Sequence, residues 1–559
     1  MKYELKKFDA GGRIGLISHN GKNLITPNLL PVVSPIDNLI PPKELFVDFG
    51  ASALFTNAYI LFRNKENSLR AQLKGLHSYL DYPGLIATDS GAFQHYMYGT
   101  SNEVTAEEIE LFQEKVQSDF PVILDVPVQL NDSYEKAKDK IIQTLNRAKD
   151  NISRRRSPNS AWYGPIHGTL YPDLLQRCCE EMNGLDYDVY AVGGIVKAMN
   201  DYDFELCVDI FLTVNKYIRK DKPLHMFGLG LPQFFSLAVA TGADLMDSAA
   251  YILFAKEGRY FTLEGTRNIA DLTELPCSCP ICSTYSAKEI NSLFKSRKKL
   301  STPQNNKGIE LIAKHNLYIS FGELKVIRES IRAGTLWELV EQRIQSHPKL
   351  IRGYEKIAKY WNELEKNIPL GRKKGLLLKG DVSFSRPIFY RMVNQVHHKY
   401  RIPKNSVLLL VPEYTETLFN TTDGRELISA IEGILVKSHQ HIEPMVISSY
   451  FGVIPLDLYG VYPFSQREWV LPRQGHNISF DPVSSVLEYL KKNQDNYNYI
   501  IILYPKENEV PLSPENTKRS HFMEEIIDIL ENKREYFWGP KTSIVYIQDI
   551  QEILEIINN

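Results

Sequence analysis

The first 345 residues alternate short apolar segments with amphipathic segments of helical period. Apolar segments of strand length lie at 84–89, 122–126, 161–167, 189–194, 224–228 and 243–247. Strands separated by helices run parallel, because each helix carries the chain back along the sheet before the next strand begins. Six or more such units in one domain predict an α/β fold of the (β/α)8 TIM-barrel class.

Polar or very small residues close these apolar segments. The C-terminal strand ends of a barrel form its active-site face, so we expect these residues to converge on one pocket. A single carboxylate after a strand often only caps the next helix. Three carboxylates together with paired glycines make that explanation weaker. The candidate residues are Asp89, Asp125, His167, Gly193, Gly194, Gly228 and Asp247.

A second domain is expected beyond residue 345. Residues 337–347 form a predicted helix that closes the first domain, and a new alternation follows it. Its predicted strands lie at 407–411, 445–448, 499–503 and 543–547, and its predicted helices near 424–438, 482–492, 520–532 and 548–557. The sequence therefore predicts a catalytic domain over 1–345 and a smaller α/β domain over 346–559.

Cys277, Cys279 and Cys282 form a C-x-C-x-x-C cluster just after the last apolar segment of the first domain. Three thiolates leave one corner of a tetrahedral ion open, and His315, about thirty residues on, could fill it. The spacing predicts one structural Zn²⁺ in a zinc-binding subdomain over 277–315. With 6 cysteines in 559 residues, a disulfide framework is not expected and a reducing cytoplasm fits.

The overall charge is balanced, with 65 Lys and Arg against 67 Asp and Glu. Nucleic-acid contacts would therefore come from local basic patches, at 154–156, 295–299, 372–374 or 397–401. Each patch is also ordinary for a solvated helix end or loop, and the run beside the cysteine cluster is the best candidate. The charged N-terminus and the lack of a long apolar run predict neither secretion nor membrane insertion.

The acids suit chemistry at a sugar carbon. A carboxylate can attack C1′ to form a covalent glycosyl-enzyme, while a second acid handles the proton of the leaving group. Asp247 and Asp89 could fill these roles from different strands. Asp125 could accept hydrogen bonds from the N1–H and 2-amino edge of a guanine-like base. Phe93 and Phe227 could stack on a purine, although core packing explains them equally well.

The order of these features resembles the tRNA-guanine transglycosylases. The resemblance is carried by residues 88–94 (Thr-Asp-Ser-Gly-Ala-Phe-Gln), the later acids, the basic linker at 256–262, the cysteine cluster and the late histidine. Residues 247–256 (Asp-Ser-Ala-Ala-Tyr-Ile-Leu-Phe-Ala-Lys) look like the archaeal branch, the archaeosine enzymes. The resemblance covers roughly 1–345 and continues more weakly into the second domain.

The resemblance implies a role for each candidate residue. Asp247 would attack C1′ and release guanine from tRNA, and Asp89 would act as general acid and base. The base would lie in a pocket formed by Asp125, Phe93, His167, Gly193, Gly194 and Phe227. The incoming base would be 7-cyano-7-deazaguanine (preQ0), at guanine 15 of the D-loop. This pentosyl transfer, a step of archaeosine biosynthesis, needs no ATP or redox cofactor.

Two departures from the family pattern leave the choice of base open. His167 stands where the family usually has Gln, and Ala92 stands where the archaeal enzymes have Ser. Both would change hydrogen bonding in the pocket without touching the acids.

Four other functions share part of this pattern. Archaeosine synthase needs a cysteine in the second domain, and no cysteine follows Cys282. Deazaguanine insertion into DNA would use the same chemistry. A non-catalytic RNA-binding subunit is disfavoured because all three acids are present. An iron–sulfur radical enzyme usually carries its cysteines early in the barrel.

The expected partners follow from the resemblance. Family members pair as homodimers, and archaeal members commonly end in a small β-barrel RNA-binding module of the PUA type. Such a module needs several glycine-bearing tight turns. After Gly475 the sequence has only Gly539, so we expect no PUA module. A separate PUA-domain protein could then assist tRNA binding.

Overall fold

The structure is a computed structural model that describes residues 1–92, 104–295, 307–413, 422–465, 467–470, 480–503, 514–532 and 543–558. The chain divides into two compact units, Met1–Tyr360 and Trp361–Asn559. The first unit runs past the expected end at 345. Helix α17 (Pro348–Glu355) packs against helix α10 (Phe204–Tyr217) and buries Tyr354, so these residues belong to the first core.

The first unit opens with an antiparallel sheet of β1 (Lys2–Asp9), β2 (Gly12–His19) and β3 (Lys22–Ile25). Eight strands that pair in parallel follow it. They are β4 (Asn28–Pro31), β5 (Ala53–Asn57), β6 (Leu85–Asp89), β7 (Phe120–Pro121), β8 (Tyr163–Ile166), β9 (Val189–Val192), β10 (Leu224–Met226) and β11 (Leu245–Ser248). Nearly every residue of these strands is buried, as expected of strands covered on both faces.

The parallel strands form two sheets. One has the order β4-β11-β10-β9-β8 and the other β5-β6-β7. Single parallel bridges join their edges, Val32 to Phe55 on one side and Val122 to Tyr163 on the other. Each strand therefore lies beside the strand that follows it in the chain.

The strand expected at 122–126 is much shorter in the structure. β7 ends at Pro121, and only Val122 makes a further bridge. Pro121 has no N–H to donate to a ladder, and the Asp125 N–H turns back to the carbonyl of Ile123 at 3.0 Å. Val122 and Ile123 are buried and Leu124 and Val126 are half-buried, and the run ends as a turn that carries Asp125.

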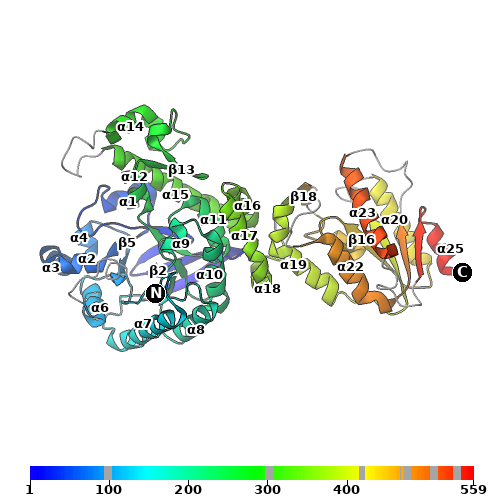
Figure 1. The fold of residues 1–559 in the computed structure, drawn as a ribbon, viewed down its shortest axis with the longest axis horizontal. Helices are drawn as coiled ribbons and strands as arrows, with labels where there is room; N and C mark the ends of the chain where they lie inside the picture. Colours follow the sequence, from blue (N-terminus) through cyan, green and yellow to red (C-terminus); the bar gives the residue numbers. More distant parts are fainter. Residues whose placement is uncertain are drawn as a thin grey trace. The chain divides into compact units, whose positions relative to one another are not determined.

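Helices lie outside the parallel strands (Figure 1). They are α1 (Pro42–Phe49), α2 (Ala58–Arg63), α3 (Lys65–Lys74), α4 (Leu76–Leu80), α6 (Ala106–Lys115), α7 (Tyr134–Arg154), α8 (Pro172–Asn183), α9 (Val196–Asn200), α10, α11 (Pro232–Ala240) and α12 (Ala250–Lys256). None of the helices in the described ranges is both long and apolar enough to span a bilayer.

A small lobe follows α12 and contains the cysteines. It comprises the hairpin of β12 (Arg259–Thr262) and β13 (Gly265–Asn268), with α13 (Pro280–Thr284) and α14 (Ala287–Lys295). Helix α15 (Lys307–Ala333) joins the lobe to the rest of the unit, and α16 (Leu336–Ile344) follows it. The buried amide of Asn316 on α15 accepts from the Phe261 N–H at 2.8 Å and donates to the carbonyls of Tyr251 and Arg259, both at 3.1 Å. This amide holds the hairpin against the helix.

The second unit is built on a sheet with the order β17-β16-β15-β19-β20, in which β17 is antiparallel. Its strands are β15 (Ser406–Pro412), β16 (Ile442–Ser448), β17 (Gly452–Pro455), β19 (Tyr497–Leu503) and β20 (Ser543–Ile547), and β14 (Leu376–Lys379) pairs separately with β18 (Arg467–Val470). The helices are α18 (Trp361–Leu364), α19 (Pro387–Asn394), α20 (Thr422–Lys437), α21 (Leu456–Tyr459), α22 (Pro482–Asn493), α23 (Pro514–Asn532) and α25 (Glu552–Asn558). The four strands and four helices predicted here are present.

Candidate active site and metal cluster

A cavity of about 860 Å³ opens where the parallel strands of the first unit end. Its lining includes the residues predicted from the strand ends: Asp89, Asp125, His167, Gly193, Gly194, Phe227, Gly228 and Asp247. Ala92 also lines it, whereas Phe93 lies outside the described residues. Strands from both parallel sheets therefore bring three carboxylates to one cavity.

Asp89 is the last residue of β6 and is half-buried at the cavity wall. Its Oδ1 accepts from the Gly91 N–H at 3.1 Å, and its Oδ2 accepts from the Asn57 amide at 2.7 Å. Burial raises the pKa of Asp89 from 3.8 to about 7, and the charges of Asp125 and Asp247 add to the rise, while the bond from Gly91 opposes it. A carboxyl with a pKa near neutrality can both give and take a proton.

Asn57 holds Asp89 in place. Its Oδ1 accepts from the N–H of Ile60 at 2.8 Å and so caps α2, which leaves the amide nitrogen to donate to Asp89. The cap removes the usual uncertainty about which end of an amide is which. Asn57 was not predicted as a site residue.

Asp125 and His167 form a buried pair. The Nε2 of His167 lies 2.6 Å from Oδ2 of Asp125, and within the described part of the chain its Nδ1 has no hydrogen-bond partner. The imidazole lies against Gly193, where an added Cβ would be 2.4 Å from its Cε1 atom. Gly193 is therefore needed as a glycine to make room for the ring. His167 occupies one oxygen of Asp125 and orients the carboxylate at the cavity wall.

Asp247 on β11 is held from one side. Its Oδ1 accepts a hydrogen bond from the Gly228 N–H at 3.0 Å and also lies 3.0 Å from Nε2 of His225. The other ring nitrogen of His225 lies 2.9 Å from the Tyr163 hydroxyl. His225 and Tyr163 were not predicted as site residues. The available signal was a histidine within the apolar segment 224–228.

Phe227 belongs to an aromatic cluster as well as to the cavity wall. Its ring centroid lies 5.8 Å from those of Phe55 and Tyr163 and 4.9 Å from that of His225. Core packing and access to the cavity are therefore combined in this side chain.

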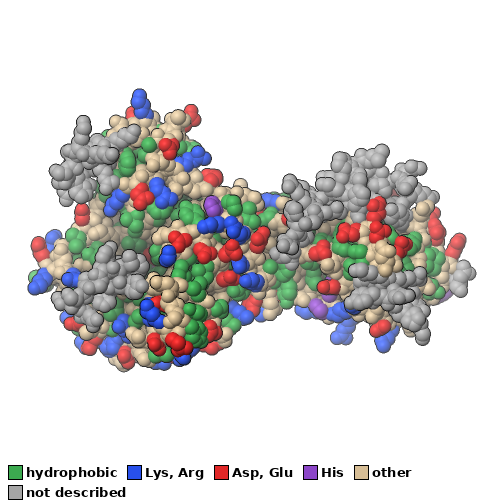
Figure 2. Space-filling model, in the orientation of Figure 1, with side chains coloured by type: hydrophobic (Ala, Val, Ile, Leu, Met, Phe, Trp, Pro, Cys, Tyr) green, Lys and Arg blue, Asp and Glu red, His purple; other side chains and the backbone are tan. Residues whose placement is uncertain are grey.

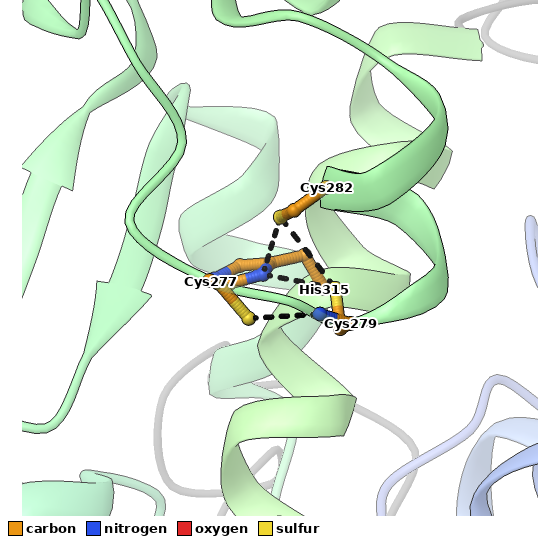
Figure 3. A group of neighbouring side chains, drawn as sticks. All are labelled: Cys277, Cys279, Cys282 and His315. Atoms are coloured by element: carbon orange, nitrogen blue, oxygen red, sulfur yellow. Dashed lines mark hydrogen bonds between the residues drawn. The ribbon is translucent and has the colours of Figure 1, made fainter.

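Cys277, Cys279 and Cys282 of the small lobe come together with His315 of α15 (Figure 3). Their possible ligand atoms all lie within 4.8 Å of one another. The Sγ atoms of Cys279 and Cys282 are 3.5 Å apart, and Nδ1 of His315 lies 3.5 and 3.3 Å from them. Zinc–ligand bond lengths around a tetrahedral ion place donor atoms roughly 3.5–3.8 Å apart. The cluster therefore has the donors and the spacing to hold a metal ion.

The surroundings of His315 prepare it as a ligand. Its Nε2 lies 2.9 Å from the carbonyl of Phe261, which requires a proton on Nε2 and leaves the lone pair of Nδ1 facing the sulfurs. The Tyr260 ring stacks on the imidazole with a centroid distance of 3.5 Å, and its hydroxyl lies 3.1 Å from Sγ of Cys282.

The basic patches predicted as nucleic-acid contacts differ in what their side chains contact. Arg154 donates to Oε2 of Glu110 from Nε and Nη2 at 2.9 and 2.8 Å, and the Arg155 guanidinium lies over Tyr187, 4.5 Å from its ring centroid. Both are engaged within the fold. Residues 296–299 lie outside the described residues. Elsewhere, acidic and basic side chains are interspersed on the face shown in Figure 2, as the balanced composition predicts.

Comparison with known proteins places the chain in a class. The family model described as queuine tRNA-ribosyltransferase (TGT) matches residues 9–349, more than half of the chain. The protein belongs to this family.

Similar individual proteins come from methanogens, and each is named a tRNA-guanine(15) transglycosylase. The chain is 36% identical to one from Methanococcus maripaludis over 83% of its own length and 69% of the relative's. It is 36% identical to one from Methanocaldococcus jannaschii over 90% of its length and 75% of the relative's. A Methanobrevibacter smithii protein is 33% identical over 87% and 72%.

Proposed function

We propose that this protein is a tRNA-guanine(15) transglycosylase that exchanges guanine 15 of tRNA for 7-cyano-7-deazaguanine in archaeosine biosynthesis. The observation that carries the proposal is the meeting of Asp89, Asp125 and Asp247 in one cavity of a family member. The printed names of the methanogen relatives support the same activity and position.

The proposed mechanism has two displacements at C1′. Asp247 attacks C1′ through a carboxylate oxygen, the C1′–N9 bond breaks, and its electron pair leaves with guanine. Asp89 protonates N9 of the departing base. The incoming 7-deazaguanine gives its N9 proton to the Asp89 carboxylate and attacks C1′, which releases Asp247. The pKa of Asp89 near 7 suits it to both proton transfers.

Base recognition is assigned to Asp125. One carboxylate oxygen is held by His167, and the group faces the same cavity as Asp89 and Asp247. It can accept from N1–H and the 2-amino group of a guanine-type base, and adenine has neither donor. Phe227, Gly193 and Gly194 complete the described part of the proposed base pocket, and Phe93 remains a predicted member of it.

We also propose that the eight parallel strands form a (β/α)8 barrel. The order of neighbours supports this, because the bridges Val32 to Phe55 and Val122 to Tyr163 would link the two sheets at both edges. A site at the C-terminal ends of the strands is where this fold carries its chemistry.

The metal cluster is proposed to hold one structural Zn²⁺ through Cys277, Cys279, Cys282 and His315. Three thiolates and one imidazole fill a tetrahedral shell, so a zinc ion there would stabilise the lobe and leave no open position for a substrate. The homodimer and the separate PUA-domain protein stay predictions, which light scattering of the purified chain and tRNA binding with and without such a protein would test.

The deciding experiment is incorporation of labelled guanine and 7-cyano-7-deazaguanine into an unmodified tRNA transcript, with the product mapped. We expect label at position 15 and none in duplex DNA. Label in DNA alone would support the DNA-modifying alternative, and no label with either substrate would support a non-catalytic RNA-binding role.

A further inference from the structure

The hydrogen bonds of Asp247 are distributed unequally between its two oxygens. Within the described residues, Oδ1 takes both the Gly228 N–H and the contact with His225 Nε2, and the side chain lines the cavity. His225 is fully buried, so its ring is fixed by what surrounds it. Oδ2 is left as the oxygen that can reach a substrate.

The hydrogen bonds that link Tyr163, His225 and Asp247 allow the position of each proton to be assigned. Tyr163 is fully buried. Burial is the larger cause that raises the pKa of its hydroxyl well above 10, and the charge of Asp247 raises it further. The hydroxyl therefore keeps its proton and can donate to Nδ1 of His225 at 2.9 Å, and the facing carboxylate oxygen of Asp247, which only accepts, requires the ring proton on Nε2. A neutral imidazole that accepts at Nδ1 carries its proton on Nε2, and this N–H donates to Asp247.

We propose that His225 is a positioning residue that holds Asp247 by its non-attacking oxygen and controls how readily the covalent intermediate is resolved. The inference rests on the proposed function, because it concerns the aspartyl ester of that reaction. His225 touches Asp247 and Tyr163 and is not assigned any contact with RNA or base.

The charge on Oδ1 changes during the reaction. When Oδ2 bonds to C1′ and the C1′–N9 electron pair leaves with the base, Oδ1 becomes the carbonyl oxygen of a neutral ester. When the incoming base attacks C1′, the C1′–Oδ2 pair returns to the carboxylate, and negative charge reappears on Oδ1. The donors from His225 and Gly228 therefore favour the carboxylate over the ester, as an oxyanion hole does.

The strength of the hydrogen bond from His225 gives the size of this preference for the carboxylate over the ester. A bond to a charged acceptor is worth roughly twice a bond to a neutral one. Loss of the His225 donor should raise the equilibrium share of the covalent adduct on the order of tenfold, because the carboxylate loses more than the ester does.

The test compares two amides at position 225. In His225→Gln the side-chain nitrogen reaches the place of Nε2 and can still donate to Asp247. In His225→Asn the amide reaches only the Tyr163 side. Both proteins are incubated with unmodified tRNA transcript and 7-cyano-7-deazaguanine, and the covalent protein–RNA adduct is quantified on denaturing gels beside kcat and KM.

We expect His225→Asn to raise the adduct share about tenfold and lower kcat with KM for tRNA unchanged, and His225→Gln to restore the wild-type share. Tyr163→Phe keeps the shape of the core and should shift the share in the same direction by about threefold, since one neutral hydrogen bond is lost. This variant carries the test if His225→Asn does not fold.

Equal adduct shares in His225→Asn and His225→Gln, or a wild-type share in both His225→Asn and Tyr163→Phe, would overturn the inference. A wild-type protein that forms neither adduct nor exchange product would overturn the proposed function instead. The two failures are therefore separable.

Discussion

The cavity and the cysteine cluster use their polar side chains in opposite ways. In the cluster, sulfurs and imidazole face one another, and Nε2 of His315 is bound to the carbonyl of Phe261. In the cavity, burial raises the pKa of Asp89, and among the residues that the structure describes Asp247 is bound at one oxygen only. Ligand atoms that face one another, as in the cluster, can stabilise a fold, whereas carboxylates that keep an oxygen free of hydrogen bonds are available for chemistry.

The largest expected effect is loss of the metal, which should alter the cysteine cluster. Cys279→Ser should abolish binding of the proposed zinc ion and destabilise the lobe, since structural zinc contributes on the order of 10 kcal/mol in small zinc peptides. Metal content by elemental analysis and hydrogen exchange over 259–295 would measure it. Cys207→Ser, at a buried thiol outside the cluster, is the control that should keep the metal. Equal metal content in both variants would contradict the ligand assignment.

The second expected effect is confined to the cavity. Asp247→Asn should reduce guanine exchange by about 10⁴-fold or more and abolish the protein–RNA adduct, because the covalent route loses its nucleophile. Metal content and thermal unfolding should stay as in the wild type. Asp173→Asn, a change of the same kind at an exposed carboxylate, should leave exchange unaltered. Persisting adduct in Asp247→Asn would refute the nucleophile assignment.

Asp89→Asn should lower exchange by about 10²–10⁴-fold, the usual contribution of general acid and base catalysis. The same change should affect stability in a pH-dependent way. The folded pKa of Asp89, about 7, lies above its unfolded value, so its contribution to stability is present below about pH 4 and is lost as the pH rises through 7.

The variant lacks this loss, and its stability relative to the wild type should therefore increase between about pH 4 and pH 7, by at most roughly 4 kcal/mol. Urea unfolding at both ends of this range measures the difference. A constant difference would show that Asp89 is not the group with the raised pKa.

The smallest effect concerns Asn57. Asn57→Ser keeps an oxygen to cap α2 but removes the amide donor to Asp89. The ionised form of Asp89 loses a hydrogen bond, so the pKa should rise further, and the pH–rate profile should move upward by about one unit. Asn64→Ser, at the N-cap of α3, is the matched control and should not move the profile.

Sequence order was enough to predict much of the fold because buried parallel strands are continuous apolar runs. The predicted strand at 407–411 appears as Ser406–Pro412, and that at 499–503 as Tyr497–Leu503. The cysteine spacing likewise predicted the cluster with His315, because few side chains can complete such a ligand set.

What the sequence could not provide were hydrogen bonds between distant strands. Tyr163 and His225 are 62 residues apart, and nothing local indicates that the histidine faces Asp247. Asn57 similarly needed the pairing of β5 with β6, which places it opposite Asp89. The Arg154 run showed a basic composition, but only the fold revealed its partner Glu110.

The close fit between Gly193 and the His167 ring also constrains how this pocket can vary among relatives. A Cβ at position 193 would lie 2.4 Å from the ring, so no homologue can gain a side chain there while keeping an imidazole in this place at 167. The two positions should covary. We expect a substitution at 193 only after His167 has been replaced by a smaller side chain or by one that points away from 193.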